Sequence, residues 1–274
     1  MKLHSKSFAK LNLCLHILGK RDDNFHNIES VFHMIDFYDE IDFCLRKDDV
    51  FNLSCSVPTI ANESNLINKV FGIMKQEYSK INTGIDVYLK KNIPLASGLG
   101  GGSSNAAVAI LAINNLYNLN LTKNDMMHIA ENIGSDVPFF LTGGTAYITG
   151  RGEQVEAIDY SDRFFILIFP GLEVSTQMIY DQVKESDHQK IQGPDIICTS
   201  LHNSLEEIVI QKFPLLGQTK YWLSSFGRVR MSGTGSTLFI EYENYESARI
   251  AYKDIRKRYK SKIVSSLDSY DIFS

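Results

Sequence analysis

Residues 94–107 read PLASGLGGGSSNAA, a stretch rich in glycine and serine that runs without a break into a strongly helix-forming segment. Glycine lets successive backbone N–H groups turn inward and form an anion-binding concavity. The helix that follows points its unpaired N–H groups and the positive end of its dipole at the same place. The stretch therefore predicts a binding site for a phosphate group, carried by a nucleotide or by another phosphorylated molecule.

Several familiar glycine motifs are excluded. No Lys follows the glycines, as the Walker pattern GxxxxGK[ST] requires, and Ser103 stands where the dinucleotide fingerprint that starts at Gly98 needs its third glycine. The HRD and DFG motifs of protein kinases are missing from the sequence. The alternative to a phosphate site is a flexible crossing between a strand and a helix, but such loops rarely alternate Gly-Leu-Gly before an Ala-rich helix.

Length and charge limit the possible classes of protein. The chain has 274 residues, 44% hydrophobic content and a net charge of -4. It is long enough to bury a sizeable core, and we expect two domains. Nucleic acid is not expected as the main partner, because no long Lys/Arg stripe is present to neutralise a phosphate backbone. The short basic stretch at residues 256–260 is interpreted as a solvated helix face.

Cysteine usage and the N-terminal residues point to a cytoplasmic protein. The four cysteines are too few and too scattered for a disulfide framework or a CxxC metal site, so we expect reduced core thiols at Cys14, Cys44, Cys55 and Cys198. The apolar run after Lys10 is short and lacks the small-residue cleavage site of a signal peptide. No segment approaches the ~20 apolar residues that span a bilayer, and no membrane partner is expected.

Alternation of apolar and polar residues predicts strands in the first half of the chain. Residues 11–17 alternate in this way, which predicts a half-buried strand whose polar face carries Lys10, Asn12, Cys14 and His16. The same alternation predicts strands of one sheet at residues 41–45, 51–57 and 85–89.

Apolar residues at helical spacing predict three helices in this half, at residues 66–78, at 105–117, and from about 122 to 134. Ser64 or Asn62 is expected to cap the first helix. Thr122 and Asp125 have the spacing of a capping box for the third helix.

The second half opens with an apolar run at residues 164–169, which predicts a central strand. Further helices are expected at residues 176–183, 204–210, 215–226 and 245–259, and further strands at 229–232 and 238–242. A domain boundary is expected near residues 155–163. We place it so that residues 1–158 form an N-terminal domain and residues 159–274 a C-terminal domain.

A second glycine cluster, MSGTGS at residues 231–236, lies between two of these predicted strands. Alone it indicates a hairpin turn. Together with the first glycine loop it is a candidate second wall of a nucleotide site.

Three segments, in their order and spacing, resemble the three motifs of the GHMP small-molecule kinases. They are Ala9-Lys10-Leu11-Asn12-Leu13, the glycine loop at residues 94–107 and the MSGTGS cluster. The similarity covers nearly the whole chain. The doubled serine before Asn105, the GSDVP segment at residues 134–138 and the DNFH segment at residues 23–26 are most similar to family members that phosphorylate a cytidine diphosphate-bearing alcohol of the non-mevalonate isoprenoid pathway.

The resemblance implies a two-domain α+β fold. The N-terminal domain is expected to be like domain 2 of ribosomal protein S5 and to bind ATP. The C-terminal domain is expected to be ferredoxin-like, with the active site in the cleft between the two domains.

The resemblance also implies ATP as co-substrate and Mg²⁺ as its ion. Backbone N–H groups of residues 98–102 are expected to contact the β- and γ-phosphates, with a hydroxyl added by one of the two serines that follow. No acidic residue lies within the loop, so Mg²⁺ is expected to be held mainly by phosphate oxygens and water, with no protein ligand assigned. The expected ATP-binding residues are Pro94, Leu95, Ala96, Ser97, Gly98, Leu99, Gly100, Gly101, Gly102, Ser103, Ser104, Asn65, Leu66 and Lys91.

The resemblance implies catalytic roles for Lys10 and Asp136. A free Asp has a pKa of ~3.9 and a neighbouring ammonium lowers it further, so such a carboxylate is a weak base at neutral pH. We therefore expect Asp136 to orient and hydrogen-bond the acceptor hydroxyl. Lys10 is expected to stabilise charge on that carboxylate and on the γ-phosphoryl group.

Substrate recognition is expected to involve a cluster of aromatic residues. Phe25, Phe32 and Tyr180 are expected to stack against the cytosine and His26 to hydrogen-bond it. A phenylalanine at position 25, where tyrosine is common in the family, keeps a stacking face and removes one polar contact. For Phe32 a position in the core is the alternative. The remaining expected substrate-binding residues are Asn12, Gly233 and Thr234.

Two other functions stay open. The same chemistry on a different acceptor would make the protein a homoserine, mevalonate or sugar kinase, and Phe25 with His26 is the feature that discriminates. The alternative from another class is a non-catalytic module that binds a nucleotide or RNA. The net negative charge of the chain and the presence of Lys10 and Asp136 argue against it. The expected partner is a small-molecule substrate bearing a cytidine diphosphate group, bound by a monomer or a weak homodimer.

Overall fold

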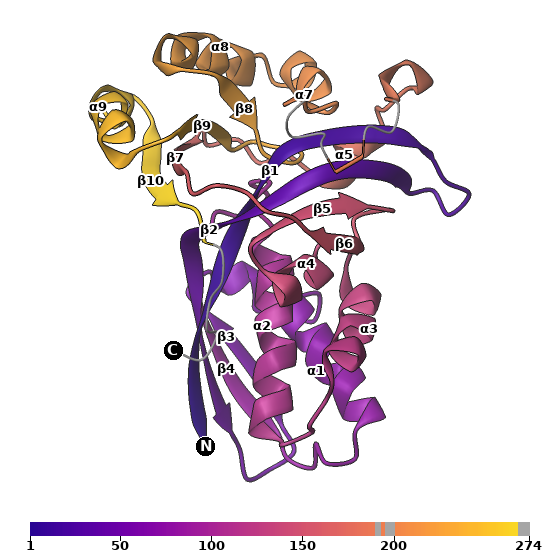
Figure 1. Ribbon diagram of the computed structural model, residues 1–274. Helices are drawn as coiled ribbons and strands as arrows, with labels where there is room; N and C mark the ends of the chain where they lie inside the picture. Colours follow the sequence, from indigo (N-terminus) through magenta and orange to yellow (C-terminus); the bar gives the residue numbers. More distant parts are fainter. Residues whose placement is uncertain (190–192, 195–200, 268–274) are drawn as a thin grey trace.

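The structure is a computed structural model that describes residues 1–189, 193–194 and 201–267. Its strands form a six-stranded sheet in the first half of the chain and a four-stranded sheet in the second, which confirms the expected α+β class (Figure 1). The first half contains β1 (Lys2–Lys20), β2 (His26–Leu45), β3 (Phe51–Cys55), α1 (Leu66–Glu77), β4 (Ile85–Lys90), α2 (Gly101–Leu116), α3 (Lys123–Ile133), α4 (Val137–Thr142), β5 (Thr145–Thr149) and β6 (Gln154–Ala157).

The first sheet is built around a long hairpin of β1 and β2, which pair from Lys2 opposite Cys44 to Lys20 opposite His26. The sheet runs in the order β3-β4-β2-β5-β6, and β1 pairs with β2 outside this path. The predicted strands therefore share one sheet. Helices α1, α2 and α3 cover one face of this sheet, and the far end of the hairpin curves away from them toward the second half of the chain (Figure 1).

β1 is buried on both faces, so the predicted half-buried strand is wrong. The four residues of its polar face are all buried, Lys10, Asn12, Cys14 and His16. The reason is that other segments cover that face. The Nζ of Lys10 lies 3.5 Å from Asp136 Oδ2, and the ring of His16 packs against that of His202 with the ring centroids 5.9 Å apart.

The N-cap of α1 differs from the prediction. Asn65 caps this helix, because its side-chain oxygen accepts the backbone N–H of Ile67 at 3.0 Å. Asn62 instead accepts the backbone N–H of Ser64 at 2.9 Å, which forms the turn before the helix. Neither of the two predicted caps therefore serves the helix.

Helix α2 begins at Gly101, four residues before the predicted start. Gly100 is its N-cap in the left-handed region, with φ 70°, so the last loop glycines form the first turn of the helix itself. The predicted capping box of Thr122 and Asp125 at the start of α3 is confirmed. The short α4 and the strands β5 and β6 were not predicted.

The second half contains β7 (Phe164–Phe169), α5 (Thr176–Tyr180), α7 (Glu206–Lys212), α8 (Pro214–Leu223), β8 (Val229–Met231), β9 (Leu238–Tyr242), α9 (Tyr245–Ile255) and β10 (Lys260–Ser265). The strand order β10-β7-β9-β8 confirms the predicted central strand and gives the fourth-first-third-second arrangement of a ferredoxin-like sheet. Helices α5, α8 and α9 are shorter than predicted. β10 was missed, because this edge strand begins with Lys260 and Lys262, whose charges are typical of sheet edges.

The two sheets are joined by a short segment. β6 ends at Ala157 and β7 begins at Phe164, and we propose that the domain boundary lies between them, after residue 158. The halves also touch away from this segment, because the backbone N–H of Ser265 donates to the carboxylate of Asp36 at 2.7 Å.

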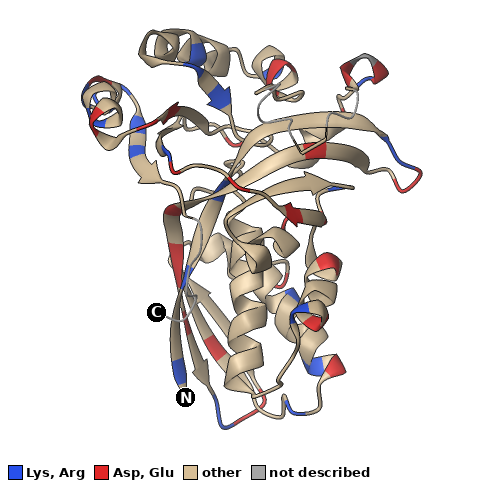
Figure 2. Cartoon of the chain, viewed as in Figure 1, with Lys and Arg blue, Asp and Glu red and all other residues tan. Residues whose placement is uncertain are grey.

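The cysteines are free thiols where the structure describes them. Cys14 is buried, whereas Cys44 and Cys55 are only half-buried, and Cys198 lies outside the described residues. In Figure 2 acidic and basic residues are interspersed along the described chain. Across residues 1–189, 193–194 and 201–267, no helix combines the length and the apolar character needed to cross a membrane.

Candidate active site

A cavity of about 910 Å³ brings the predicted site residues of both halves together. It is lined by β1, the turn that joins β1 to β2, the glycine loop and the start of α4 from the first half. Residues of α5 and of the MSGTGS cluster line it from the second half. Of the predicted site residues, Asn65 and Ser104 lie outside this lining.

Lys10 and Asp136 meet in this cavity. The Lys10 Nζ lies 3.5 Å from Asp136 Oδ2, and the side chains are 5% and 32% exposed, so the ammonium is enclosed and the carboxylate opens to the cavity. Asp136 precedes the first residue of α4 and makes no capping hydrogen bond, which leaves its oxygens available. The pair therefore presents one positive and one negative group at one point of the wall.

The environment of Lys10 acts on its pKa in two directions. Burial lowers the pKa of Lys10 below its ordinary value, and the charge of Asp136 opposes that effect. The Nζ donates to Asn12 Oδ1, lies 3.4 Å from the carbonyl oxygen of Gly98 and sits 4.3 Å over the ring centroid of Phe32. Together these contacts hold the side chain in a single place.

The two glycine clusters touch. The hydroxyl of Ser232 donates to the carbonyl of Gly98 at 2.9 Å, and the backbone N–H of Thr237 donates to the carbonyl of Ser97 at 3.3 Å. The MSGTGS cluster therefore packs against the glycine loop, and its residues Gly233 and Thr234 line the cavity.

The glycine loop opens into the first turn of α2. The first N–H groups of a helix have no intrahelical acceptor, so residues 101–103 offer donors at the cavity wall. Ser103 lines the cavity, but Ser104 is fully buried and its hydroxyl accepts from Ser7 at 2.7 Å. Of the two serines expected to reach a phosphate or Mg²⁺, the geometry supports Ser103 alone.

Lys91 lines the cavity beside the glycine loop, and an ion pair with a buried aspartate holds its side chain. Its ammonium pairs with Asp39, which is fully buried and also accepts the backbone N–H groups of Asn92 and Ile93 at 2.8 and 2.9 Å. The Asn65 carboxamide is used within its own turn, as the cap of α1 and as a donor to the carbonyl of Ile60.

The predicted aromatic residues also line the cavity. Phe25 is 50% exposed, with the guanidinium carbon of Arg151 5.2 Å from its ring centroid. His26 and Tyr180 lie with ring centroids 5.5 Å apart. Phe32 lines the cavity but is 1% exposed, so it belongs chiefly to the core, as its alternative reading held.

Burial favours the neutral forms of His26 and Tyr180. It lowers the pKa of His26, with His188 and Lys20 acting in the same direction. It raises the pKa of Tyr180, and the charge of Asp136 adds to the effect. Both groups can therefore serve as uncharged hydrogen-bonding partners for a base.

Arg151 is the most informative lining residue that sequence reasoning missed. It stands between Gly150 and Gly152, and a basic residue in a two-glycine turn was a signal that could have singled it out. The other lining residues not predicted are Leu15, Asp23, Asn24, Ile28, Ser135, Thr176, Gln177 and Asp181.

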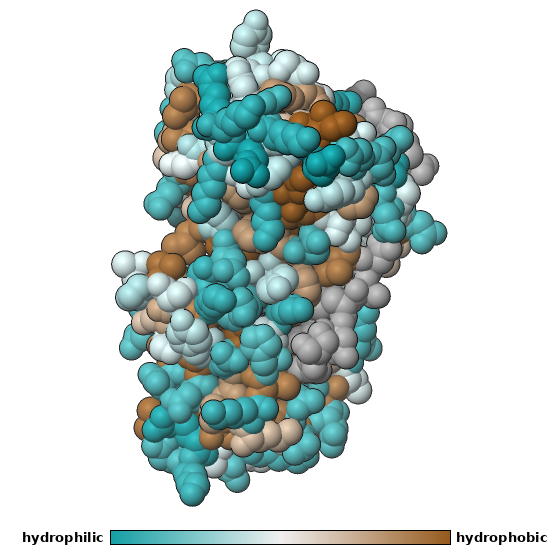
Figure 3. All heavy atoms as spheres, turned by 90° about the vertical axis from the view of Figure 1, so that its left-hand side faces the viewer, coloured by the Kyte–Doolittle hydropathy of each residue, from teal (hydrophilic) through white to brown (hydrophobic). Residues whose placement is uncertain are grey.

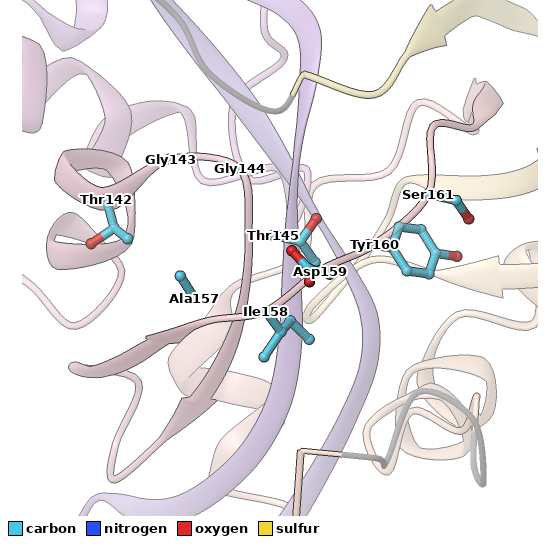
Figure 4. Close-up of a pocket in the computed structure, with 9 residues that line it drawn as sticks. All are labelled: Thr142, Gly143, Gly144, Thr145, Ala157, Ile158, Asp159, Tyr160 and Ser161. Carbon is cyan, nitrogen blue, oxygen red and sulfur yellow. The ribbon is translucent and has the colours of Figure 1, made fainter.

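A second cavity of about 620 Å³ lies at the junction of the two halves, between the turn at Gly143 and Gly144 and the segment that contains Asp159 and Tyr160 (Figure 4). It shares no lining residue with the first cavity and contains neither Lys10 nor Asp136. Asp159 is the one charged residue among those that line it, so this cavity offers no comparable pair of opposite charges.

Comparisons with known proteins agree with this site. Residues 65–144 match the family model described as GHMP kinases N terminal domain, and residues 185–261 match that described as GHMP kinases C terminal. A crystal structure of 4-(cytidine 5'-diphospho)-2C-methyl-D-erythritol kinase superimposes with a TM-score of 0.82 at 27% identity, covering 96% of this chain and 99% of the other. The expected two-domain fold is thereby confirmed.

Curated relatives are similar over nearly their whole length. The 4-diphosphocytidyl-2-C-methyl-D-erythritol kinase of Caldanaerobacter subterraneus subsp. tengcongensis is 36% identical over 97% of this chain and 96% of its own. The enzyme of the same name from Syntrophus aciditrophicus is 39% identical over 89% of this chain and 91% of its own. The chain belongs to the GHMP kinase family.

Proposed function

We propose that this protein is an ATP-dependent kinase that phosphorylates the 2-hydroxyl of 4-diphosphocytidyl-2-C-methyl-D-erythritol. The observation that carries the proposal is the Lys10–Asp136 pair, which faces the same cavity as the glycine loop. Phosphoryl transfer asks a protein for positioning and charge stabilisation more than for covalent chemistry, and this cavity supplies both. The names of the curated relatives support the choice of acceptor.

The glycine loop and the first turn of α2 hold the phosphates of ATP in this proposal. Their free N–H groups and the helix dipole favour negative charge there. Lys91 adds a positive charge at the same wall. The remaining expected ATP contacts, Asn65 and Leu66, lie at the start of α1, where Leu66 reaches the cavity.

Mg²⁺ belongs to the proposal as the ion that accompanies ATP. In the described part of the chain no group of three or more His, Cys, Asp or Glu side chains is arranged to hold a metal ion. Ser103 lines the cavity at the loop, where its hydroxyl fits a hydrated Mg²⁺ that is bound mainly through phosphate oxygens. When bound, such an ion neutralises phosphate charge.

The acceptor hydroxyl lies between Asp136 and the γ-phosphate in this proposal. Asp136 accepts the hydrogen bond of the hydroxyl and orients its oxygen toward phosphorus. Lys10 stabilises the charge on Asp136 and on the phosphoryl group being transferred. The hydroxyl proton passes to Asp136 late in the transfer, when the new oxygen–phosphorus bond has formed.

The cytidine end of the acceptor lies against Phe25 and Tyr180, and His26 reads the edge of the base. Stacking tolerates any base, whereas a hydrogen bond to the base edge discriminates. Asn12, Phe32, Gly233 and Thr234 line the path between the base and the hydroxyl.

A monomer or weak homodimer in the cytoplasm completes the proposal. On the face shown in Figure 3, apolar side chains are interrupted by hydrophilic ones. The exposed apolar residues of α8 and α9 are few, Leu215, Tyr221, Tyr245 and Ile250. Scattered exposed apolar groups of this kind support at most a weak self-association.

The test is an acceptor panel. Purified protein is incubated with ATP, Mg²⁺ and either 4-diphosphocytidyl-2-C-methyl-D-erythritol, homoserine, mevalonate or galactose, and ADP is measured. The proposal predicts ADP formation that depends on the cytidine-bearing acceptor, with a new phosphomonoester signal at its 2-position in ³¹P NMR. Turnover with another acceptor alone would point to a different kinase of the family. ATP binding without turnover of any alcohol would point to a non-catalytic module.

A further inference from the structure

We propose that Ser30 is a positioning residue for phosphoryl transfer. Its hydroxyl fixes the carboxamide of Asn12, and Asn12 in turn holds the ammonium of Lys10 beside Asp136. Ser30 lies on β2, is fully buried and does not line the cavity, so it acts through the other residues. This inference rests on the proposed kinase function.

The hydrogen bonds of Ser30 determine which way the Asn12 carboxamide faces. Ser30 Oγ donates to the carbonyl of Cys14 at 2.5 Å and lies 3.1 Å from Asn12 Nδ2. A hydroxyl has one hydrogen and two lone pairs. Because the hydrogen is used on Cys14, the side that faces Asn12 can only accept. The amide nitrogen of Asn12 must therefore face Ser30.

The other end of the carboxamide then meets the catalytic lysine. Asn12 Oδ1 accepts from Lys10 Nζ, and the residue is 2% exposed, so both ends of its carboxamide are used inside the protein. The backbone N–H of Asn12 donates to Ser232 Oγ at 3.1 Å, which fixes the residue from the second half of the chain. A reversed carboxamide would aim N–H donors at an ammonium and leave them unpaired, which is costly in a buried site.

The oxygen of Asn12 favours the charged form of Lys10 and so opposes the effect of burial on its pKa. Facing its ammonium are Asp136 from α4, the carbonyl of Gly98 from the glycine loop and the ring of Phe32 from β2. Tyr180 from α5 is the titratable group that faces Asp136. The Asn12 oxygen adds a neutral acceptor to this set, and losing it lowers the pKa of Lys10.

The test compares wild type with Ser30→Ala. The ¹³Cε resonance of Lys10, assigned with Lys10→Met, reports the pKa of the lysine in the free protein without any turnover. Ser30→Ala is expected to lower that pKa by about one unit and kcat at pH 7 about tenfold, with the KM for ATP within about twofold of wild type. The alkaline limb of the kcat profile moves to lower pH by the same amount as the NMR titration.

Ser204→Ala is the matched control. Ser204, like Ser30, is a buried serine that is hydrogen-bonded to β1. Its hydroxyl accepts the backbone N–H of Ile17 at 3.3 Å and is not bonded to Lys10, Asn12 or Asp136. It is expected to lose stability and to keep the wild-type Lys10 titration. Asn12→Asp, which keeps an oxygen toward Lys10 and adds a charge, is expected to raise the pKa of Lys10 and decides the matter if Ser30→Ala does not fold.

The positioning role is overturned if Ser30→Ala keeps the Lys10 titration and kcat of wild type, or if Ser204→Ala shifts the titration equally. It is also overturned if Asn12→Asp leaves the Lys10 titration where wild type has it. A wild-type protein that turns over no acceptor, combined with the expected shift in Ser30→Ala, would contradict the proposed function and leave the network in place. The two proposals therefore fail separately.

Discussion

Gly98 and Ser232 pack backbone against backbone, although 134 residues separate them in the sequence. A Cβ atom at position 98 would lie 2.0 Å from the carbonyl oxygen of Ser232, and the φ of Gly98 is +76°, a conformation that favours glycine. The glycine loop and the MSGTGS cluster are thus one unit, in which the second half of the chain sets the position of the predicted phosphate site.

Gly98→Ala is therefore expected to disturb both the loop and the protein's stability. Both the backbone clash and the positive φ oppose a side chain, so we expect a loss of ~2 kcal/mol or more in the free energy of unfolding and a KM for ATP at least about tenfold higher. Urea unfolding and steady-state kinetics measure the two effects. Gly72→Ala is the control, because nothing lies within 4 Å of a Cβ in this α1 position. It should raise stability by ~0.5–1 kcal/mol, and equal effects at both positions would contradict the packing argument.

Asp39 anchors the segment before the glycine loop. It is fully buried, pairs with Lys91 and accepts from Asn105 Nδ2 at 3.0 Å. Asp39→Asn leaves the Lys91 ammonium buried without its counter-charge, so the free energy of unfolding should fall by ~3 kcal/mol. Asp36→Asn, at an exposed site on the same strand, should cost under ~1 kcal/mol. Similar losses in the two variants, measured by urea unfolding, would show that the buried pair is no special anchor.

His33 should make stability depend on pH. Burial lowers the pKa of His33 to about 4. The enclosed ring is hydrogen-bonded to Thr145 and Ser266 at 2.7 and 2.8 Å. Between pH 6.5 and 4 the unfolded chain then binds a proton that the folded protein does not. Stability is complete above pH 6.5 and falls by ~3 kcal/mol as the pH drops to 4.

His33→Gln removes the titrating group and keeps hydrogen-bonding capacity. Urea unfolding at pH 8, where the imidazole is neutral in both states, measures the cost of the substitution itself. Between pH 6.5 and 4 the variant should lose ~3 kcal/mol less stability than wild type does. An unchanged pH dependence would mean that His33 titrates normally in the folded protein.

Phe25 should affect binding of the acceptor more than its turnover. Its ring is half exposed at the cavity mouth, and stacking of a base on an aromatic ring is worth ~1–3 kcal/mol. Phe25→Ala is expected to raise the KM for the cytidine-bearing acceptor about tenfold with little change in kcat, whereas Phe25→Tyr should retain or lower KM. Tyr88→Ala removes a similarly exposed ring from β4, outside the cavity, and should change neither constant. A wild-type KM in Phe25→Ala would remove this ring from the substrate site.

The sequence predicted those elements whose signals are local. The alternation at residues 85–89, the apolar run at residues 164–169 and the Thr122–Asp125 capping box each depend on neighbours in the chain, and the structure has them where expected. The full length of β2 was missed, because polar residues within it have distant partners. Asp39, for example, interrupts the apolar pattern of β2 but serves the segment that leads to the glycine loop.

The candidate site was predictable only through the resemblance of its motifs. A lone Lys10 in a strand and a lone Asp136 after a glycine carry no local signal of their meeting, since 126 residues separate them and only the packed fold brings them to 3.5 Å. The role of Ser30 was invisible for the same reason. Its hydroxyl acts through a hydrogen bond between two strands, which a pattern along one strand does not contain.

The most direct test of the catalytic pair is a single-turnover measurement on Asp136→Asn with γ-labelled ATP and the cytidine-bearing acceptor. Calorimetry first establishes that the variant binds both substrates with Kd values within about threefold of wild type. If Asp136 orients the acceptor hydroxyl beside Lys10, the rate of phosphoryl transfer should fall at least about a hundredfold. A transfer rate within about tenfold of wild type would contradict the assignment of Asp136 to the reaction.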